Sequence, residues 1–170
     1  AKNNVQNHHE LRKSSYIFIF IMFMSYLCGS EKISTGSEFW LSTSDVSSLK
    51  NSMLIKGDES AALKLSNYYF FSLNDTNRGL CCLFISSKLG NVKSSEALKN
   101  YYKISPMLTV NIFNGFRNDL ERLKSNKDIL DEYILYCYYA FNNNINESNA
   151  YKKYLEEKNV TEKLLKIKSK

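Results

Sequence analysis

Few residues of this chain could carry out chemistry, and they are widely separated. His8, His9 and Glu10 stand together near the N-terminus, where two imidazoles and a carboxylate could ligate a metal. The chain has no other His, so a Ser-His-Asp or Cys-His catalytic group has no candidate elsewhere. Because the cluster precedes an apolar segment, we interpret it as part of a polar tail that has no role in the function. We predict no metal site and no cofactor.

Acidic side chains give no stronger indication of catalysis. They stand at helical spacings among lysines, as Asp128, Asp131 and Glu132 do, and this spacing is typical of solvated helix faces. No glycine-rich phosphate loop is present in the sequence. We therefore predict that the protein is not an enzyme, and a hydrolase of cell-wall substrates is the less favoured alternative.

The cysteines are Cys28, Cys81, Cys82 and Cys137, and no two have the Cys-x-x-Cys spacing of a zinc ribbon or a thioredoxin-like site. Adjacent cysteines rarely bridge each other, because their side chains diverge along a helix. An export route would permit Cys137 to pair with Cys81 or Cys82, and Cys82–Cys137 is the disulfide that we name. Three buried small side chains are the alternative, which we favour.

Composition and charge narrow the class of protein. The length of 170 residues suits one domain, and 44% hydrophobic residues suffice for a packed core. One Pro and six Gly are too few for a many-stranded β fold or a doubly wound nucleotide-binding fold. The net charge of +6 comes from lysines interleaved with acids, so we predict no nucleic-acid partner.

The N-terminal region has the order of a targeting signal. A polar stretch ends in Leu11-Arg12-Lys13, and an uncharged apolar run of 13 residues follows over 16–28. A bilayer-spanning helix needs about 20 residues, whereas the apolar part of a signal peptide has roughly 7–15. We predict a signal peptide or N-terminal membrane anchor over 1–30, with lipidation of Cys28 left open and a buried element of the fold as the alternative.

This prediction places the protein outside the cytoplasm, either in the periplasm or anchored to a membrane and facing the periplasm. Residues 31–44 are predicted to be a linker, in which Phe39-Trp40-Leu41 forms an apolar plug that docks on the domain.

Helical signals continue through the rest of the chain, over 45–170. Ser44 or Asp45 is the expected cap of the first helix, and Pro106 favours the start of a long helix. The expected helices span 45–56, 92–102, 105–124, 129–141 and 147–168, the last of them charged and solvated. Two more are expected between these, one from Asp58 to a turn at Asn74-Asp75 and one from that turn to the break at Gly90-Asn91.

An internal repeat is visible at an offset of 33 residues, which separates Gly57 from Gly90. At the same offset Leu65 matches Leu98, and the run Asn67-Tyr68-Tyr69 matches Asn100-Tyr101-Tyr102. A period near 33 residues with two helices per unit is typical of a helix-hairpin solenoid.

These residues resemble the Sel1-like repeat, a relative of the tetratricopeptide repeat. Gly57-Asp58 opens the unit, Ala61, Leu65 and Tyr69 follow at the family's spacings, and Gly90-Asn91 opens the next unit. The resemblance implies an all-α solenoid with a divergent C-terminal helical part. The structural repeat positions that it implies are Gly57, Ala61, Leu65, Tyr69, Gly90, Leu98 and Tyr102.

The resemblance also implies a function. Sel1-like proteins are adaptors and partner-binding modules, and small exported bacterial members include immunity proteins that neutralise toxic effectors by direct binding. We therefore expect an exported immunity protein with a protein partner, and the alternative is a scaffold or adaptor of an envelope assembly. The binding face that we predict consists of Lys64, Asn67, Tyr68, Asn100 and Tyr101, since repeated Tyr and amide side chains suit a protein interface. The alternative, to which we give equal weight, is that these residues form an ordinary hydrated surface.

Overall fold

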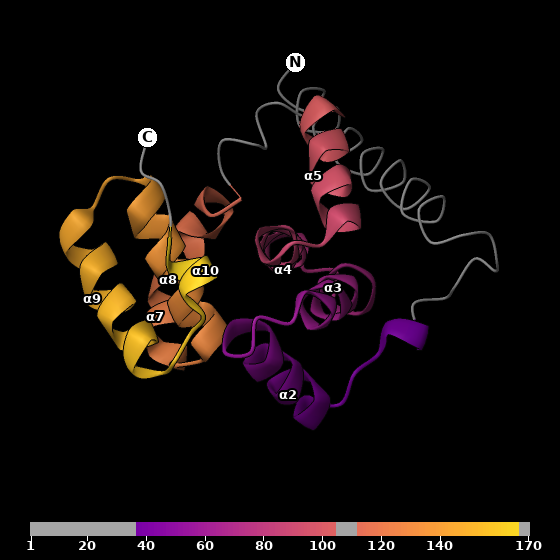
Figure 1. The fold of residues 1–170 in the computed structure, drawn as a ribbon, viewed down its shortest axis with the longest axis horizontal. Coiled ribbons are helices and arrows are strands. Elements are labelled where there is room, and N and C mark those ends of the chain that lie inside the picture. Colours follow the sequence, from indigo (N-terminus) through magenta and orange to yellow (C-terminus); the bar gives the residue numbers. More distant parts are fainter. Residues whose placement is uncertain (1–36, 105–111, 167–170) are drawn as a thin grey trace, which may run out of the picture. The chain divides into compact units, whose positions relative to one another are not determined.

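The computed structural model describes residues 37–104 and 112–166 of the chain. The regular structure in these two ranges is helical, which confirms the predicted all-α class (Figure 1). The segment predicted to be a signal or anchor, the cluster at 8–10 and Cys28 lie outside the described residues. So does the helix start expected at Pro106.

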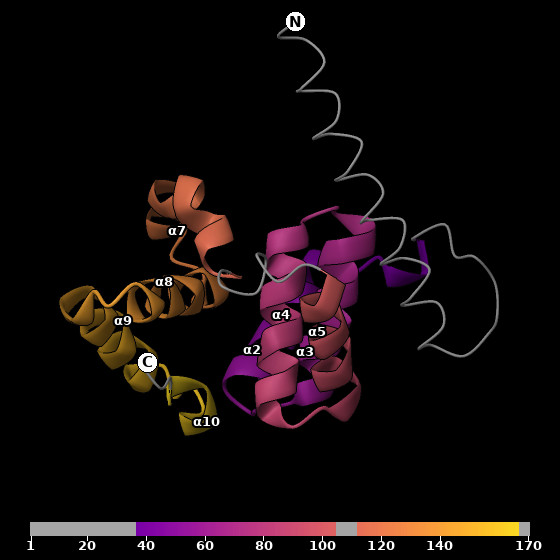
Figure 2. The same cartoon turned by 90° about the horizontal axis from the view of Figure 1, so that it is seen from above.

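The α-helices are α2 (Thr43–Leu54), α3 (Glu59–Asn67), α4 (Thr76–Leu89), α5 (Val92–Ile104), α7 (Leu120–Asn126), α8 (Ile129–Phe141), α9 (Ile145–Glu157) and α10 (Glu162–Leu165). Within the described ranges the other elements are two short 3-10 helices, η1 (Ser37–Phe39) and η3 (Asn114–Asp119), and one π-helix, η2 (Tyr68–Ser72). Helix α4 contacts both α3 and α5, and the three lie side by side (Figure 2).

Short polar side chains start the first helices. Ser42, rather than Ser44 or Asp45, caps α2, and it forms a capping box in which Ser42 Oγ accepts from Asp45 N at 3.1 Å. Asp58 accepts from the backbone N–H groups of Ser60 and Ala61 and so caps α3. Such caps satisfy backbone donors that the first turn of a helix leaves unpaired.

The 33-residue offset recurs in local structure. Gly57 and Gly90 both have a left-handed backbone, with φ of 70° and 117°, which glycine adopts without strain. Asn91 caps α5 as Asp58 caps α3, because Asn91 Oδ1 accepts from Ser94 N at 2.9 Å. Leu65 and Leu98 are both buried, as predicted.

At other positions, the packing of α3 differs from that of α5. Ser66 is buried on α3, and its Oγ donates to the carbonyl of Gly79 on α4 at 2.9 Å. Lys99 holds the matching place on α5 and is exposed. Ser66 thus packs against a neighbouring helix, whereas the side chain at the matching place on α5 faces solvent. The shared local structure does not by itself establish a repeated helix pair.

The long helix predicted up to Lys124 is wrong over residues 112–119. This stretch forms a turn and then η3, and α7 begins at Leu120. Phe113 and Phe116 are both buried, and a spacing of three residues brings side chains to one side of a 3-10 helix. Asn77 Nδ2 also donates to the carbonyl of Gly115 at 3.0 Å, so α4 holds this turn directly.

The single helix predicted for the tail is also wrong. Helix α9 ends at Glu157, Asn159 takes a left-handed φ of 59°, and α10 begins at Glu162. The break turns Val160 and Leu164 into the core, where both are buried. The tail is therefore part of the packed domain rather than a solvated helix.

Candidate functional site

An aromatic surface lies where the plug meets η2. We use this name for Phe39, Trp40, Tyr68 and Phe71. The rings of Phe39 and Phe71 are 5.0 Å apart between centroids, and Trp40 contacts Tyr68 edge to face at 6.2 Å. The predicted docking of the plug is thereby confirmed. Trp40 is 64% exposed, whereas Tyr68 beneath it is 9% exposed.

The structure corrects part of the predicted binding face. Tyr68 belongs to the core rather than to an exposed stripe: it is 9% exposed, and its ring contacts those of Tyr69 at 5.5 Å and Trp40 at 6.2 Å between centroids. Lys64 is exposed, whereas Asn100 and Tyr101 are half-buried, and burial raises the pKa of Tyr101. Asn67 is half-buried, and its Oδ1 atom is buried without a hydrogen-bond partner.

Several of the predicted structural repeat positions lie in the core. Ala61 and Tyr69 are buried, as the repeat pattern predicts. Burial is also the main reason that the pKa of Tyr69 is raised. The side chain of Tyr102 lies outside the described part of the molecule.

A buried charge network was not predicted from the sequence. Arg78 Nη2 on α4 lies 2.8 Å from Asp131 Oδ1 on α8, and the Asp131 side chain is only 3% exposed. Asn126 Nδ2 donates to the other oxygen of Asp131 at 2.7 Å. Asp75 Oδ2 pairs with Arg78 Nη1 at 3.0 Å. The prediction of a solvated face is therefore wrong for Asp131, and also for Glu132, which is 9% exposed.

Burial alone would lower the pKa of Arg78, but its hydrogen bond to Asp131 and their mutual attraction outweigh this effect, so the pKa is raised. A second pair joins α2 to α8, with Lys50 Nζ 2.7 Å from Asp128 Oδ2. Both pairs connect helices, and each charge is balanced by a partner within the protein. We therefore interpret them as contacts that hold the helices together. One signal could have revealed the network: the segment 129–141 is apolar on almost every side, so a charge within it must find a partner.

The three described cysteines are free thiols buried in the core. The disulfide named between Cys82 and Cys137 is therefore absent, and the alternative of buried small side chains is confirmed. Burial is the main reason that the pKa of each of these thiols is raised, and Cys81 and Cys82 are consecutive residues of α4. Neighbouring residues of a helix point about 100° apart, so Cys82 faces a different side.

Native protein is expected to react with iodoacetamide at Cys81, Cys82 and Cys137 about ten-fold or more slowly than urea-unfolded protein at pH 8. Burial raises the pKa of each thiol, so little reactive thiolate is present, and the reagent cannot reach the sulfur. Peptide mass mapping of the alkylated sites over time measures this. Equal rates in both states would contradict the buried placement.

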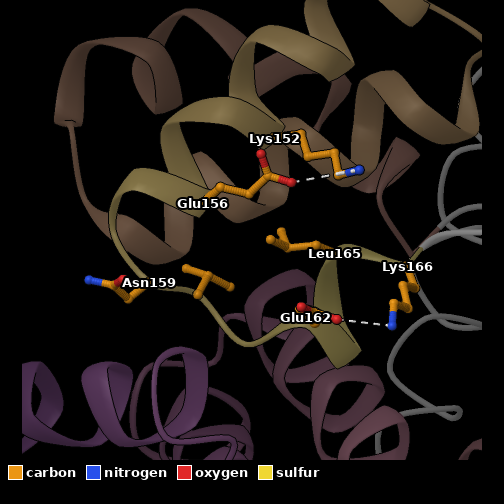
Figure 3. A pocket seen from close by; sticks show the side chains of 7 residues that line it. Lys152, Glu156, Asn159, Glu162, Leu165 and Lys166 are labelled. Atoms are coloured by element: carbon orange, nitrogen blue, oxygen red, sulfur yellow. Dashed lines mark ion pairs between the residues drawn. The ribbon is translucent and has the colours of Figure 1, made fainter.

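A pocket of about 540 Å³ lies between the end of α9 and α10 (Figure 3). Its lining includes Val160 and Leu165, both buried, and two ion pairs. Lys152 Nζ lies 3.7 Å from Glu156 Oε1, and Lys166 Nζ lies 3.0 Å from Glu162 Oε2. The figure shows Leu165 between these two pairs. No residue of this pocket was singled out as a site from the sequence.

The described ranges contain no group of three or more His, Cys, Asp or Glu side chains that could hold a metal ion. Within the same ranges, no helix is both long and apolar enough to cross a bilayer. Comparisons of the chain with protein-family models, curated proteins and solved structures gave no match.

Proposed function

We propose that this protein works by binding another protein rather than by catalysis, and that the aromatic surface is the contact. The observation that carries the proposal is Trp40, a residue that is 64% exposed although its ring makes an edge contact with that of Tyr68. Trp is among the residues most enriched at the energetic centres of protein interfaces. A ring already held in place loses little conformational entropy when a partner covers it.

The proposed role is that of an exported immunity protein that neutralises a toxic effector by direct binding in the periplasm, or from a membrane anchor that faces it. The recurrence of Gly57-Asp58 as Gly90-Asn91 at helix starts supports the proposed relation to Sel1-like repeats, including a solenoid-like origin of α3, α4 and α5. The alternative is a scaffold or adaptor of an envelope assembly. A toxin gene beside this gene would favour the first role.

Replacing Trp40 by Ala is expected to raise the Kd for the partner about 10- to 1,000-fold, which corresponds to about 1–4 kcal/mol. The melting temperature should change little, because most of the Trp40 ring is already exposed to solvent. The partner is first identified by capture on the full chain and mass spectrometry, and the purified pair is then titrated calorimetrically.

Val92→Ala is the matched control, since Val92 is another exposed apolar side chain and stands at the start of α5, outside the aromatic surface. This variant should bind as the wild-type protein does. Unchanged affinity of the Trp40→Ala variant would show that the partner binds elsewhere.

A further inference from the structure

The pocket between α9 and α10 has an apolar floor and a charged rim. Val160 and Leu165 contribute buried apolar side chains to its lining, and the other lining residues are lysines, glutamates and Asn159. Figure 3 shows Leu165 between the two lysine–glutamate pairs. Its volume of about 540 Å³ lies within the range of pockets that hold drug-sized ligands. An apolar centre ringed by polar groups is also the anatomy of the anchor sites at protein interfaces.

The walls of the pocket are fixed before any ligand arrives. Helix α10 is held by three other helices: Tyr136 Oη of α8 donates to the carbonyl of Leu165 at 2.6 Å, and Lys88 Nζ of α4 donates to the carbonyl of Lys166 at 3.0 Å. At the start of α10, Thr161 N donates to the carbonyl of Leu54 in α2 at 2.9 Å. Because the pocket is preformed, little binding free energy is lost in ordering the residues of the protein that contact the ligand.

The charges of the rim are balanced, and they are exposed enough to pair with a ligand. Each lysine pairs with a glutamate on its own segment, Lys152 with Glu156 and Lys166 with Glu162, and all four side chains are substantially exposed to solvent. Ion pairs of this kind contribute little to stability, so they can exchange partners at small cost. Two positive and two negative groups around one pocket are complementary to a ligand that carries both signs.

We propose that this pocket binds a short protein segment in which an apolar side chain stands between an acidic and a basic residue. The apolar side chain lies on Val160 and Leu165, the acidic group pairs with Lys152 or Lys166, and the basic group pairs with Glu156 or Glu162. The pocket shares no residue with the aromatic surface. The two sites therefore succeed or fail independently.

The test titrates the full chain with the capped peptide acetyl-Glu-Leu-Lys-amide and follows backbone amide shifts by ¹H–¹⁵N NMR. Saturable shifts are expected at residues 152–166. Acetyl-Glu-Ala-Lys-amide should bind about ten-fold or more weakly, because it buries far less apolar surface. Acetyl-Gln-Leu-Gln-amide should bind about three-fold or more weakly, because it lacks the charges.

Each pocket lysine has a matched control lysine close to it in the chain. Lys152→Glu and Lys166→Glu should weaken binding of the charged peptide about three-fold or more, whereas Lys153→Glu and Lys163→Glu, whose side chains do not line the pocket, should not. The proposal is overturned by an absence of saturable shifts at 152–166, by equal binding of the alanine peptide, or by equal effects of the pocket and control variants. It is also overturned if free leucine binds as tightly as the peptide, because the site would then select an amino acid. Normal peptide binding by the Trp40→Ala variant is expected whatever that variant does to the partner.

Discussion

Replacing Asp131 by Ala is expected to lower the free energy of unfolding by about 3–5 kcal/mol. The substitution leaves the Arg78 guanidinium, whose side chain is 11% exposed, without its closest carboxylate in a largely dry site. Asp75 remains beside Arg78 but is more exposed and pairs with a different nitrogen, Nη1. It cannot replace the lost contact to α8. The measurement is urea unfolding followed by circular dichroism, with the wild-type and variant curves fitted to comparable m-values.

An exposed ion pair provides the control for this effect. Lys124 Nζ lies 2.9 Å from Glu121 Oε1 on α7, and the Glu121 side chain is 89% exposed. Glu121→Ala is expected to change the free energy of unfolding by less than about 0.5 kcal/mol, because solvent screens both charges. An Asp131→Ala loss as small as that would mean that the Arg78–Asp131 pair is solvated in solution.

Leu164→Ala is expected to lower the free energy of unfolding by about 2–5 kcal/mol. Leu164 belongs to a helix of only four residues near the end of the described chain, yet its side chain is 0% exposed. Truncating it leaves a cavity where α10 meets α4 and α8, in addition to the lost transfer of apolar surface from water. Thermal and urea unfolding of the purified variant measure the loss.

Lys163→Ala is the matched variant for this test. Lys163 is the neighbouring residue of α10 and is exposed, so its truncation should leave stability within about 0.5 kcal/mol of wild type. If Leu164→Ala were equally harmless, the tail would be the solvated helix that the charge pattern suggests. The peptide pocket would then lose its fixed wall as well.

The starts of α3 and α5, and the glycine breaks before them, could be predicted from the sequence, because they depend on residues close together in the chain. Asp58 and Asn91 cap helices through bonds that reach only two or three residues ahead, and Gly57 and Gly90 supply the left-handed backbone between helices. These local contacts form wherever the segment lies in the fold. The all-α class and the equivalent burial of Leu65 and Leu98 follow from the same patterns.

The candidate site was predicted only in part. The apolar plug at Phe39-Trp40 could be recognised, because three consecutive apolar residues stand in a polar stretch. Which ring would be covered could not be predicted, since the burial of Tyr68 depends on how η2 and the plug pack in the folded chain. The pocket depends on the chain reversal at Asn159, which an uninterrupted charged helical pattern did not predict.

What the sequence by itself determined is therefore part of the local structure: the helical class, the caps of α3 and α5, the glycine breaks and the recurrence of one pattern after 33 residues. Only the tertiary structure decided that Asp131 is buried beside Arg78, which is 53 residues away in the sequence. It also decided that Leu164 in the tail is buried. The physical reason is that a charged or apolar side chain is stabilised by whatever surrounds it after folding. Helical periodicity describes one segment at a time and does not contain the residues that another segment brings to it.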